Sequence, residues 1–178
     1  PRLLIKRDDL TGLATGGTNP GNVFGRLATG LYAWEGLYIR DSGVMYSGDE
    51  LAPINDADGG AVFKFVPANP APEPITRAAI ADLSKVENAA KSPFAGGSLY
   101  VLQVGTKGGG SNYGQGNQYG EGRWVGPIAD PSKARAGAAA LKATGYYRPE
   151  DLEGDPLALK SGRYRFCWTN TGVSSRRN

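Results

Sequence analysis

Short runs of apolar residues alternate with glycine- and proline-rich segments along the chain, and this spacing predicts β-strands joined by loops. The clearest runs are residues 61–66, where Val and Phe alternate with Lys, and residues 98–104, which glycines flank on both sides. The other expected strands are residues 3–7, 37–40, 44–46, 123–125 and 162–170. Two of them, 37–40 and 44–46, enclose a short Asp-Ser-Gly turn and therefore predict a hairpin.

One clear helix is expected in the second half of the chain. Asp130-Pro131 is a typical helix start, with Asp as the N-cap and Pro at the first helical position, and the alanine-rich run that follows ends near Gly145. Residues 75–90 are a weaker helix candidate. Residues 106–122 contain almost no aliphatic residue, which predicts a Gly-rich surface loop. The pattern as a whole predicts an all-β architecture with one short helix before Arg148-Pro149-Glu150.

Composition narrows the class of protein. With 178 residues, of which 40% are hydrophobic and 21% charged, the chain can form one domain with a hydrophobic core. Its net charge of +3 is too small to indicate a nucleic-acid partner, and no apolar run predicts a transmembrane helix. The chain contains no histidine, which excludes His-based triads and histidine zinc sites. Any chemistry therefore uses carboxylates, Arg, Lys, Tyr or Ser.

Residues 147–155 carry the strongest sign of a site. They place Arg148, Pro149 and four carboxylates within nine residues, directly before the aromatic run 162–170. Because proline disfavours the helical region for the residue that precedes it, we expect Arg148 and Glu150 on one extended segment, pointing to the same side. Several carboxylate oxygens suit a hard cation such as calcium, and a guanidinium suits a phosphate or a carboxylate.

Two segments of the chain resemble each other. Glu35 is followed by Asp41, Gly43 and Tyr46, and Glu150 is followed at similar spacing by Asp155, Gly162 and Tyr164. Each segment predicts an acid at a loop, then a strand, a turn and a second strand with a polar end. Successive blades of a β-propeller show this order when their loops point to a common axis.

These residues resemble the PhoX-type alkaline phosphatases and their uncharacterised relatives. The likeness runs from about Gly30 onward, and Arg148-Pro149-Glu150-Asp151 is its most specific part. The other matching segments are Trp34-Glu35-Gly36, residues 44–50, residues 61–65, residues 97–102, residues 138–145 and residues 164–170.

Members of that family are exported β-propellers in which calcium ions and an iron centre hydrolyse phosphate monoesters. The resemblance therefore implies calcium, with iron as a further cofactor, a phosphorylated small-molecule substrate and a periplasmic or extracellular location. By position, it implies that Glu35, Glu150 and an acid of the Asp49-Glu50 pair provide metal ligands. It also implies that Arg148 and Glu150 are catalytic, with Arg148 as the phosphate clamp.

The chain departs from the family in two respects. A propeller blade takes about 40 to 50 residues, so 178 residues supply roughly three or four blades. We therefore expect residues 1–178 to form a single incomplete propeller domain, which further chain or assembly partners complete. The family's iron also needs a cysteine before Glu35, whereas the single cysteine here is Cys167, which we expect to be a buried core thiol.

Each candidate residue also has an ordinary structural interpretation. Arg148 and Glu150 by themselves would form an exposed ion pair or bind backbone carbonyls in a turn. Glu35 would cap a turn, and Asp49 and Glu50 would be loop acids that favour solubility. These interpretations remain open beside the functional one.

Three hypotheses about function follow. The first is a metal-dependent phosphoesterase in which Glu35, Glu150 and Arg148 converge on one point. The second is a non-catalytic propeller that calcium stabilises and that acts as a binding or assembly module through loop 106–122. The third is a purely structural extracellular component, in which the carboxylates can be replaced without loss of folding or assembly.

Overall fold

A computed structural model describes residues 26–52, 59–70, 92–105, 114 and 119–172. The strand expected at residues 3–7, the helix expected at residues 75–90 and most of the loop expected at residues 106–122 lie outside these ranges. No helix within the described residues is both long and apolar enough to cross a lipid bilayer.

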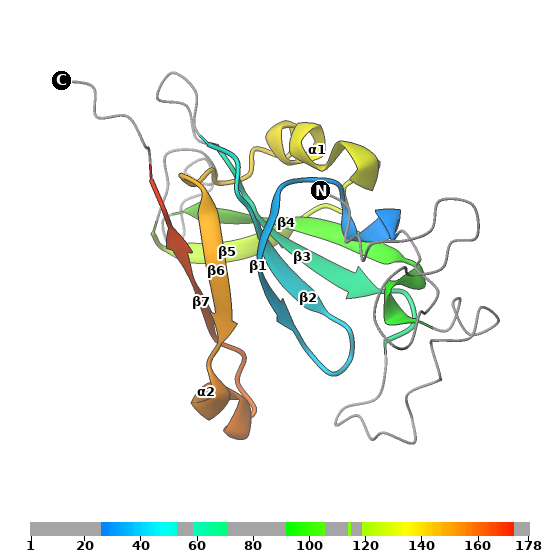
Figure 1. The fold of residues 1–178 in the computed structure, drawn as a ribbon, viewed down its shortest axis with the longest axis vertical. Helices are drawn as coiled ribbons and strands as arrows, with labels where there is room; N and C mark the ends of the chain where they lie inside the picture. The colour runs from blue at the N-terminus through cyan, green and yellow to red at the C-terminus, as the bar shows by residue number, and fades with distance from the viewer. Residues whose placement is uncertain (1–25, 53–58, 71–91, 106–113, 115–118, 173–178) are drawn as a thin grey trace, which may run out of the picture.

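Five strands form an antiparallel sheet in which neighbours in sequence are also neighbours in space. The strands are β1 (Trp34–Ile39), β2 (Met45–Asp49), β3 (Val62–Pro67), β4 (Gly97–Gly105) and β5 (Glu121–Val125). The turn between β1 and β2 closes with a hydrogen bond from the Arg40 amide to the Val44 carbonyl, 2.9 Å long, and Gly43 supplies a φ of 86°. The alternating Val and Phe residues of the sequence thus become a continuous up-and-down sheet (Figure 1).

The last part of the chain forms a separate antiparallel pair of strands, β6 (Pro149–Gly154) and β7 (Phe166–Asn170). Between them lies the short helix α2 (Pro156–Lys160), and before them lies helix α1 (Ala134–Ala140), which the 3₁₀ turn Pro131–Lys133 leads into. Two further 3₁₀ turns span Leu27–Thr29 and Pro93–Ala95. In Figure 1, α1 covers one side of the sheet and the β6–β7 hairpin stands beside β1.

The two faces of the sheet bury separate hydrophobic clusters, because successive side chains of a strand point to opposite faces. Phe63, Phe65 and Leu99 lie on the face that α1 covers, where Ala134 and Ala138 pack against them. On the other face, the β6–β7 hairpin is held by aromatic side chains as well as by Leu152. The residues of this second cluster are Tyr46, Val62, Leu102, Val104, Tyr146 and Leu152, with Tyr38, Val44, Trp124, Phe166 and Trp168 packed against it.

These observations confirm the coarse fold prediction: the described part is mostly β, its sheets are antiparallel, and a short helix precedes Arg148. The strands expected at residues 37–40, 44–46, 61–66, 98–104 and 123–125 are all present. The described strands do not close into a ring of blades, so the propeller remains a prediction.

Two details of the sequence prediction are corrected. Helix α2 was not expected, and the strand expected at residues 162–170 begins only at Phe166. Cys167 is exposed rather than buried, because its side chain points away from the sheet while its neighbours Phe166 and Trp168 point toward it.

Candidate functional site

Arg148 brings together two carboxylates that are far apart in sequence. Its Nη2 atom donates a hydrogen bond to Glu50 Oε1 and lies 3.0 Å from Glu150 Oε1. Glu50 directly follows β2, and Glu150 is the second residue of β6. The side chains are partly buried, with 28% of Arg148, 30% of Glu50 and 21% of Glu150 exposed. We call these three residues the Arg148 cluster.

The backbone at Arg148 is unusual, and it differs from the prediction. Arg148 has a φ of 54°, in the left-handed region, instead of the extended conformation expected before Pro149. The β6–β7 pairing continues on both sides of this residue, since the amides of Thr171 and Gly172 donate to the carbonyls of Arg148 and Tyr147, at 3.2 Å and 3.1 Å. A strained conformation at a non-glycine residue is common where a side chain has a functional task.

Glu35 and Glu150 occupy equivalent places in two bulged hairpins. The β1–β2 register shifts between Glu35 and Leu37, and the β6–β7 register shifts between Glu150 and Leu152. In each case the residue after the acid has a positive φ, 56° at Gly36 and 30° at Asp151. The similarity of the two segments in the sequence therefore corresponds to a similarity in structure.

The two bulges pack directly against each other. A Cβ atom on Gly36 would lie 2.3 Å from the backbone nitrogen of Leu152, so only glycine permits this approach of β1 to β6. Bulges often redirect side chains beside functional sites. Glu35 is thus near the start of β6, but it forms no hydrogen bond or ion pair with the Arg148 cluster within the described residues.

Asp49 precedes Glu50 in the chain but belongs to the opposite face of the sheet. Its carboxylate is 1% exposed and accepts two hydrogen bonds from Arg135 of α1, at 2.8 Å and 2.7 Å, and one from the Ala33 amide, at 2.9 Å. Of the predicted pair, the structure therefore brings Glu50, and not Asp49, to Arg148. Sequence reasoning missed Arg135, because nothing local marks a partner 86 positions away.

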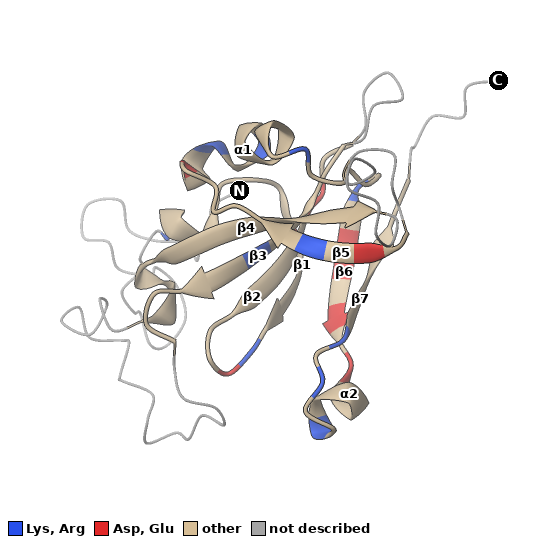
Figure 2. Cartoon of the chain, turned by 180° about the vertical axis from the view of Figure 1, so that it is seen from behind, with Lys and Arg blue, Asp and Glu red and all other residues tan. Residues whose placement is uncertain are grey.

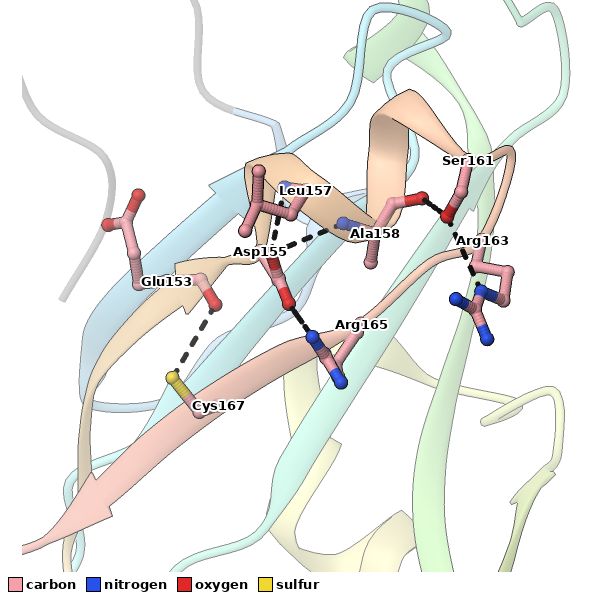
Figure 3. A network of polar contacts seen from close by, with 8 residues as sticks. All are labelled: Glu153, Asp155, Leu157, Ala158, Ser161, Arg163, Arg165 and Cys167. Carbon is pink, nitrogen blue, oxygen red and sulfur yellow. Dashed lines mark hydrogen bonds and ion pairs between the residues drawn. The ribbon is translucent and has the colours of Figure 1, made fainter.

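The acidic residues further along β6 serve other purposes. Asp151 and Glu153 are exposed. Asp155 caps α2, accepting hydrogen bonds from the amides of Leu157 and Ala158 at 2.8 Å and 3.2 Å, and it pairs with Arg165 (Figure 3). The four carboxylates of residues 147–155 thus spread along a strand, with charge at several places on it (Figure 2), and only Glu150 faces Arg148.

The electrostatics of the Arg148 cluster are unbalanced. The hydrogen bond from Arg148 holds the pKa of Glu50 below its usual value, and the same contact raises the pKa of Arg148. Glu150 Oε1 is buried and accepts no hydrogen bond, although Arg148 Nη2 is near enough for an ion pair. Two carboxylates share one guanidinium, which leaves a formal charge of −1, and Glu150 Oε1 has only the ion pair with Arg148 as its partner.

These donors match a hard cation in kind, because calcium prefers carboxylate oxygens. Glu150 Oε1 is an oxygen without a hydrogen bond, and the carboxylate of Glu50 shares its counter-ion. The set is incomplete, since calcium takes about 6 to 8 oxygen ligands. Among the described residues, no three acidic or cysteine side chains gather closely enough to hold a metal ion.

Comparison with known proteins finds similarity to a solved structure, and not to a family model or a curated protein. No protein-family model matches the chain, and no curated protein matches it. A solved structure of Pseudomonas fluorescens PhoX, in complex with the transition state analogue vanadate, resembles it with a TM-score of 0.46 and 24% sequence identity. The overlap covers 75% of this chain and 23% of the PhoX chain. PhoX is the type of protein that the sequence resembles.

Proposed function

We propose that this chain provides part of the active site of a metal-dependent phosphoesterase that hydrolyses phosphate monoesters. One observation carries the proposal: Arg148, on a left-handed backbone, lies between Glu50 and Glu150, and an oxygen of Glu150 is buried without a hydrogen bond. A buried oxygen of this kind is costly unless a ligand completes its contacts.

Each residue of the cluster has a distinct role in this proposal. Glu50 and Glu150 hold a hard cation, calcium or iron, with Glu35 from the neighbouring bulge as a further ligand. The bound cation supplies positive charge against the phosphate oxygens. The planar guanidinium of Arg148 binds the phosphoryl group through two parallel hydrogen bonds and stabilises the charge that spreads over it in the transition state. A water molecule attacks the phosphorus and gives up a proton to solvent, the P–O bond to the ester oxygen breaks, and Tyr147 or solvent provides the proton for the leaving alcohol.

The remaining ligands come from outside the described residues in this proposal. The chain spans about a quarter of the length of the PhoX chain that it overlaps. We propose that further chain or an assembly partner completes both the metal site and a propeller, and that the protein acts in the periplasm or outside the cell.

A second function is favoured by one feature of the same cluster. The guanidinium of Arg148 is already engaged by two carboxylates, so the cluster also fastens β6 to the end of β2 without any ligand. A non-catalytic module that binds calcium for stability and contacts an assembly partner would use the cluster in this way. Such a module would bind calcium without turning over a phosphate ester.

Hydrolysis of p-nitrophenyl phosphate tests the first proposal. We expect calcium-dependent hydrolysis that a chelator removes and that added calcium, with or without iron, restores. Glu150→Gln and Arg148→Lys should each lower kcat by about 10²-fold or more, because the first removes a charge that holds the cation and the second replaces the planar guanidinium with a single ammonium that cannot form two parallel hydrogen bonds. Glu153→Gln is the matched control, since Glu153 is an exposed carboxylate on the same strand and should not affect the rate.

Calorimetry with calcium separates the two functions. Calcium binding that Glu150→Gln weakens, together with no hydrolysis under any metal load, would support the assembly module and reject the phosphoesterase. If calcium does not bind at all and no hydrolysis occurs, neither function holds, and the cluster is a structural contact only.

A further inference from the structure

Asp49 lies where three parts of the molecule meet, and its side chain is fully occupied. Arg135 donates to both carboxylate oxygens, and the Ala33 amide donates to Oδ1. With 1% of its side chain exposed, Asp49 depends on these donors, because a buried carboxylate without a cation is strongly unfavourable. Arg135 has 45% of its side chain exposed, so water reaches it and its contact with Asp49 is its main described interaction.

Asp49 and Glu50 both form a hydrogen bond with Ala33. The Ala33 amide donates to the Asp49 carboxylate, and the Ala33 carbonyl accepts a hydrogen bond of 2.8 Å from the Glu50 amide. The amide and the carbonyl of Ala33 are therefore both hydrogen-bonded, to two consecutive residues. These two hydrogen bonds fix the backbone of Glu50 directly after β2. They also fix Ala33, the residue before Trp34, where β1 starts.

The backbone of Asp49 also contacts the segment that leads to Arg148. A Cβ atom on Gly60 would lie 1.7 Å from the Asp49 carbonyl oxygen and 2.9 Å from Cδ of Pro149, so Gly60 lies directly against the backbone of Asp49 and the ring of Pro149. Gly60 and Tyr146 exchange two backbone hydrogen bonds, at 2.9 Å and 2.8 Å. A shift of Asp49 would therefore displace both sides of the Arg148 cluster. It would move Glu50 through the chain, and it would move Pro149 through Gly60.

We infer that Arg135, on the opposite face of the sheet, is a positioning residue for the Arg148 cluster and acts through Asp49. The guanidinium of Arg135 keeps Asp49 in its buried place, Asp49 fixes Ala33 and the adjacent Glu50, and Glu50 meets Arg148. The hydrogen bonds and the ion pair of Arg135 go to Asp49 and not to Arg148, Glu50 or Glu150. The inference deepens the proposed function, since it concerns the same site, but it requires only that Glu50 and Arg148 interact.

Double-mutant cycles test this without any assay of activity. The coupling between Glu50 and Arg148 is measured by denaturant unfolding of the wild type, Glu50→Gln, Arg148→Met and the double variant. The same four proteins are then made with Arg135→Met. We expect a favourable coupling in the first cycle and the loss of most of it in the second. If Arg135→Met lowers stability but leaves the coupling intact, Arg135 has only a structural role and the inference is wrong.

A neutral replacement pair extends the test and covers the case in which Arg135→Met does not fold. Asp49→Asn combined with Arg135→Gln keeps an oxygen for the Ala33 amide and a donor for residue 49, and it removes both charges. We expect this pair to restore the Glu50–Arg148 coupling to near the wild-type value. A coupling that stays lost in this folded variant would overturn the inference. Lys133→Met, which removes an exposed charge just before α1, is the control and should leave the coupling unchanged.

The result is separable from the phosphoesterase proposal. A coupling that depends on Arg135 in a protein without phosphatase activity would support the positioning role and reject the proposed function. If the enzyme is active and Arg135→Met leaves the coupling, kcat and KM unchanged, the proposed function is supported and the positioning role is rejected. If both hold, Arg135→Met should lower kcat more than it raises KM, because Glu50 and Arg148 would be misplaced for the transition state.

Discussion

Asp49 and Glu50 are consecutive residues that each pair with an arginine far away in sequence, yet their environments are opposite. Asp49 is buried, and both its oxygens accept well-formed hydrogen bonds from Arg135. Glu50 is partly exposed and shares Arg148 with Glu150, whose buried oxygen accepts no hydrogen bond. The first pair is complete in itself. In the second, two carboxylates share one guanidinium, and we propose that this pair has capacity left for a ligand.

The largest effect is expected from breaking the complete pair. Arg135→Met leaves the Asp49 carboxylate buried without a cation, and we expect a loss of about 3 kcal/mol in the free energy of unfolding. Urea unfolding followed by tryptophan fluorescence measures it. Lys133→Met removes an exposed charge whose contact with Asp130 is 3.9 Å long, and it should change stability by less than about 0.5 kcal/mol. Equal effects of the two variants would show that the burial of Asp49 has no energetic weight.

No loss of stability is expected at the incomplete pair. Glu150→Gln removes a negative charge from a buried oxygen that accepts no hydrogen bond, so the free energy of unfolding should stay the same or rise by about 1 kcal/mol. The same variant should lower kcat by about 10²-fold or more if the proposed function holds, as expected of a functional site that trades stability for activity. A clear loss of stability would instead show that the ion pair between Glu150 and Arg148 stabilises the fold.

Acid should affect the Arg148 cluster in a predictable direction. The contact with Arg148 holds the folded-state pKa of Glu50 below its ordinary value of 4.5, so the stabilising contribution of Glu50 is complete above pH 4.5 and is lost as pH falls through the lowered pKa. Wild type should therefore lose more stability than Arg148→Met as pH is lowered in this acidic range. Unfolding curves at several pH values measure the difference, and parallel pH profiles for the two proteins would contradict it.

The smallest effect is expected at a third pair, which provides the exposed reference. Arg165 is 72% exposed and pairs with Asp155, so Arg165→Gln should cost less than about 0.5 kcal/mol. Asp155→Ala should cost about 1 kcal/mol, because Asp155 also caps helix α2. Unfolding both variants in parallel separates the stability contributed by the helix cap from the stability contributed by the ion pair. If the two costs were equal, the exposed pair would matter as much as the cap.

The strands were predictable because their signal is local. Val and Phe alternate around Lys64 in the sequence, and Phe63 and Phe65 duly share one face while Val62 lies on the other. Helix α2 was also within reach, since Asp155-Pro156 repeats the start signal of Asp130-Pro131, but the acid was assigned to a charge cluster instead of a cap. Competing interpretations of one residue, rather than a missing signal, caused that error.

The site was predictable only in part. The sequence indicated Arg148, Glu150 and one acid of the Asp49-Glu50 pair, and the structure brings Glu50 to them. Strand alternation implies that the two acids of that pair face opposite ways, but it does not say which one faces Arg148. That choice depends on Arg135 and on Gly60, whose contacts with Asp49 join parts of the chain that have no local relation. The left-handed Arg148 likewise overrides the local preference of a residue before proline.

The aromatic contacts of the β6–β7 hairpin have a consequence for any ligand of the cluster. Arg148 and Glu150 belong to the hairpin side, whereas Glu50 belongs to the sheet, and Phe166 and Trp168 hold the two together. A ligand that touches both sides binds the docked hairpin more tightly than the undocked one, so by thermodynamic linkage it must also shift the hairpin's equilibrium toward the docked state. Amide hydrogens along β7 would therefore exchange with solvent more slowly as ligand is added, and the same molecule that fills the site would rigidify the strand behind it.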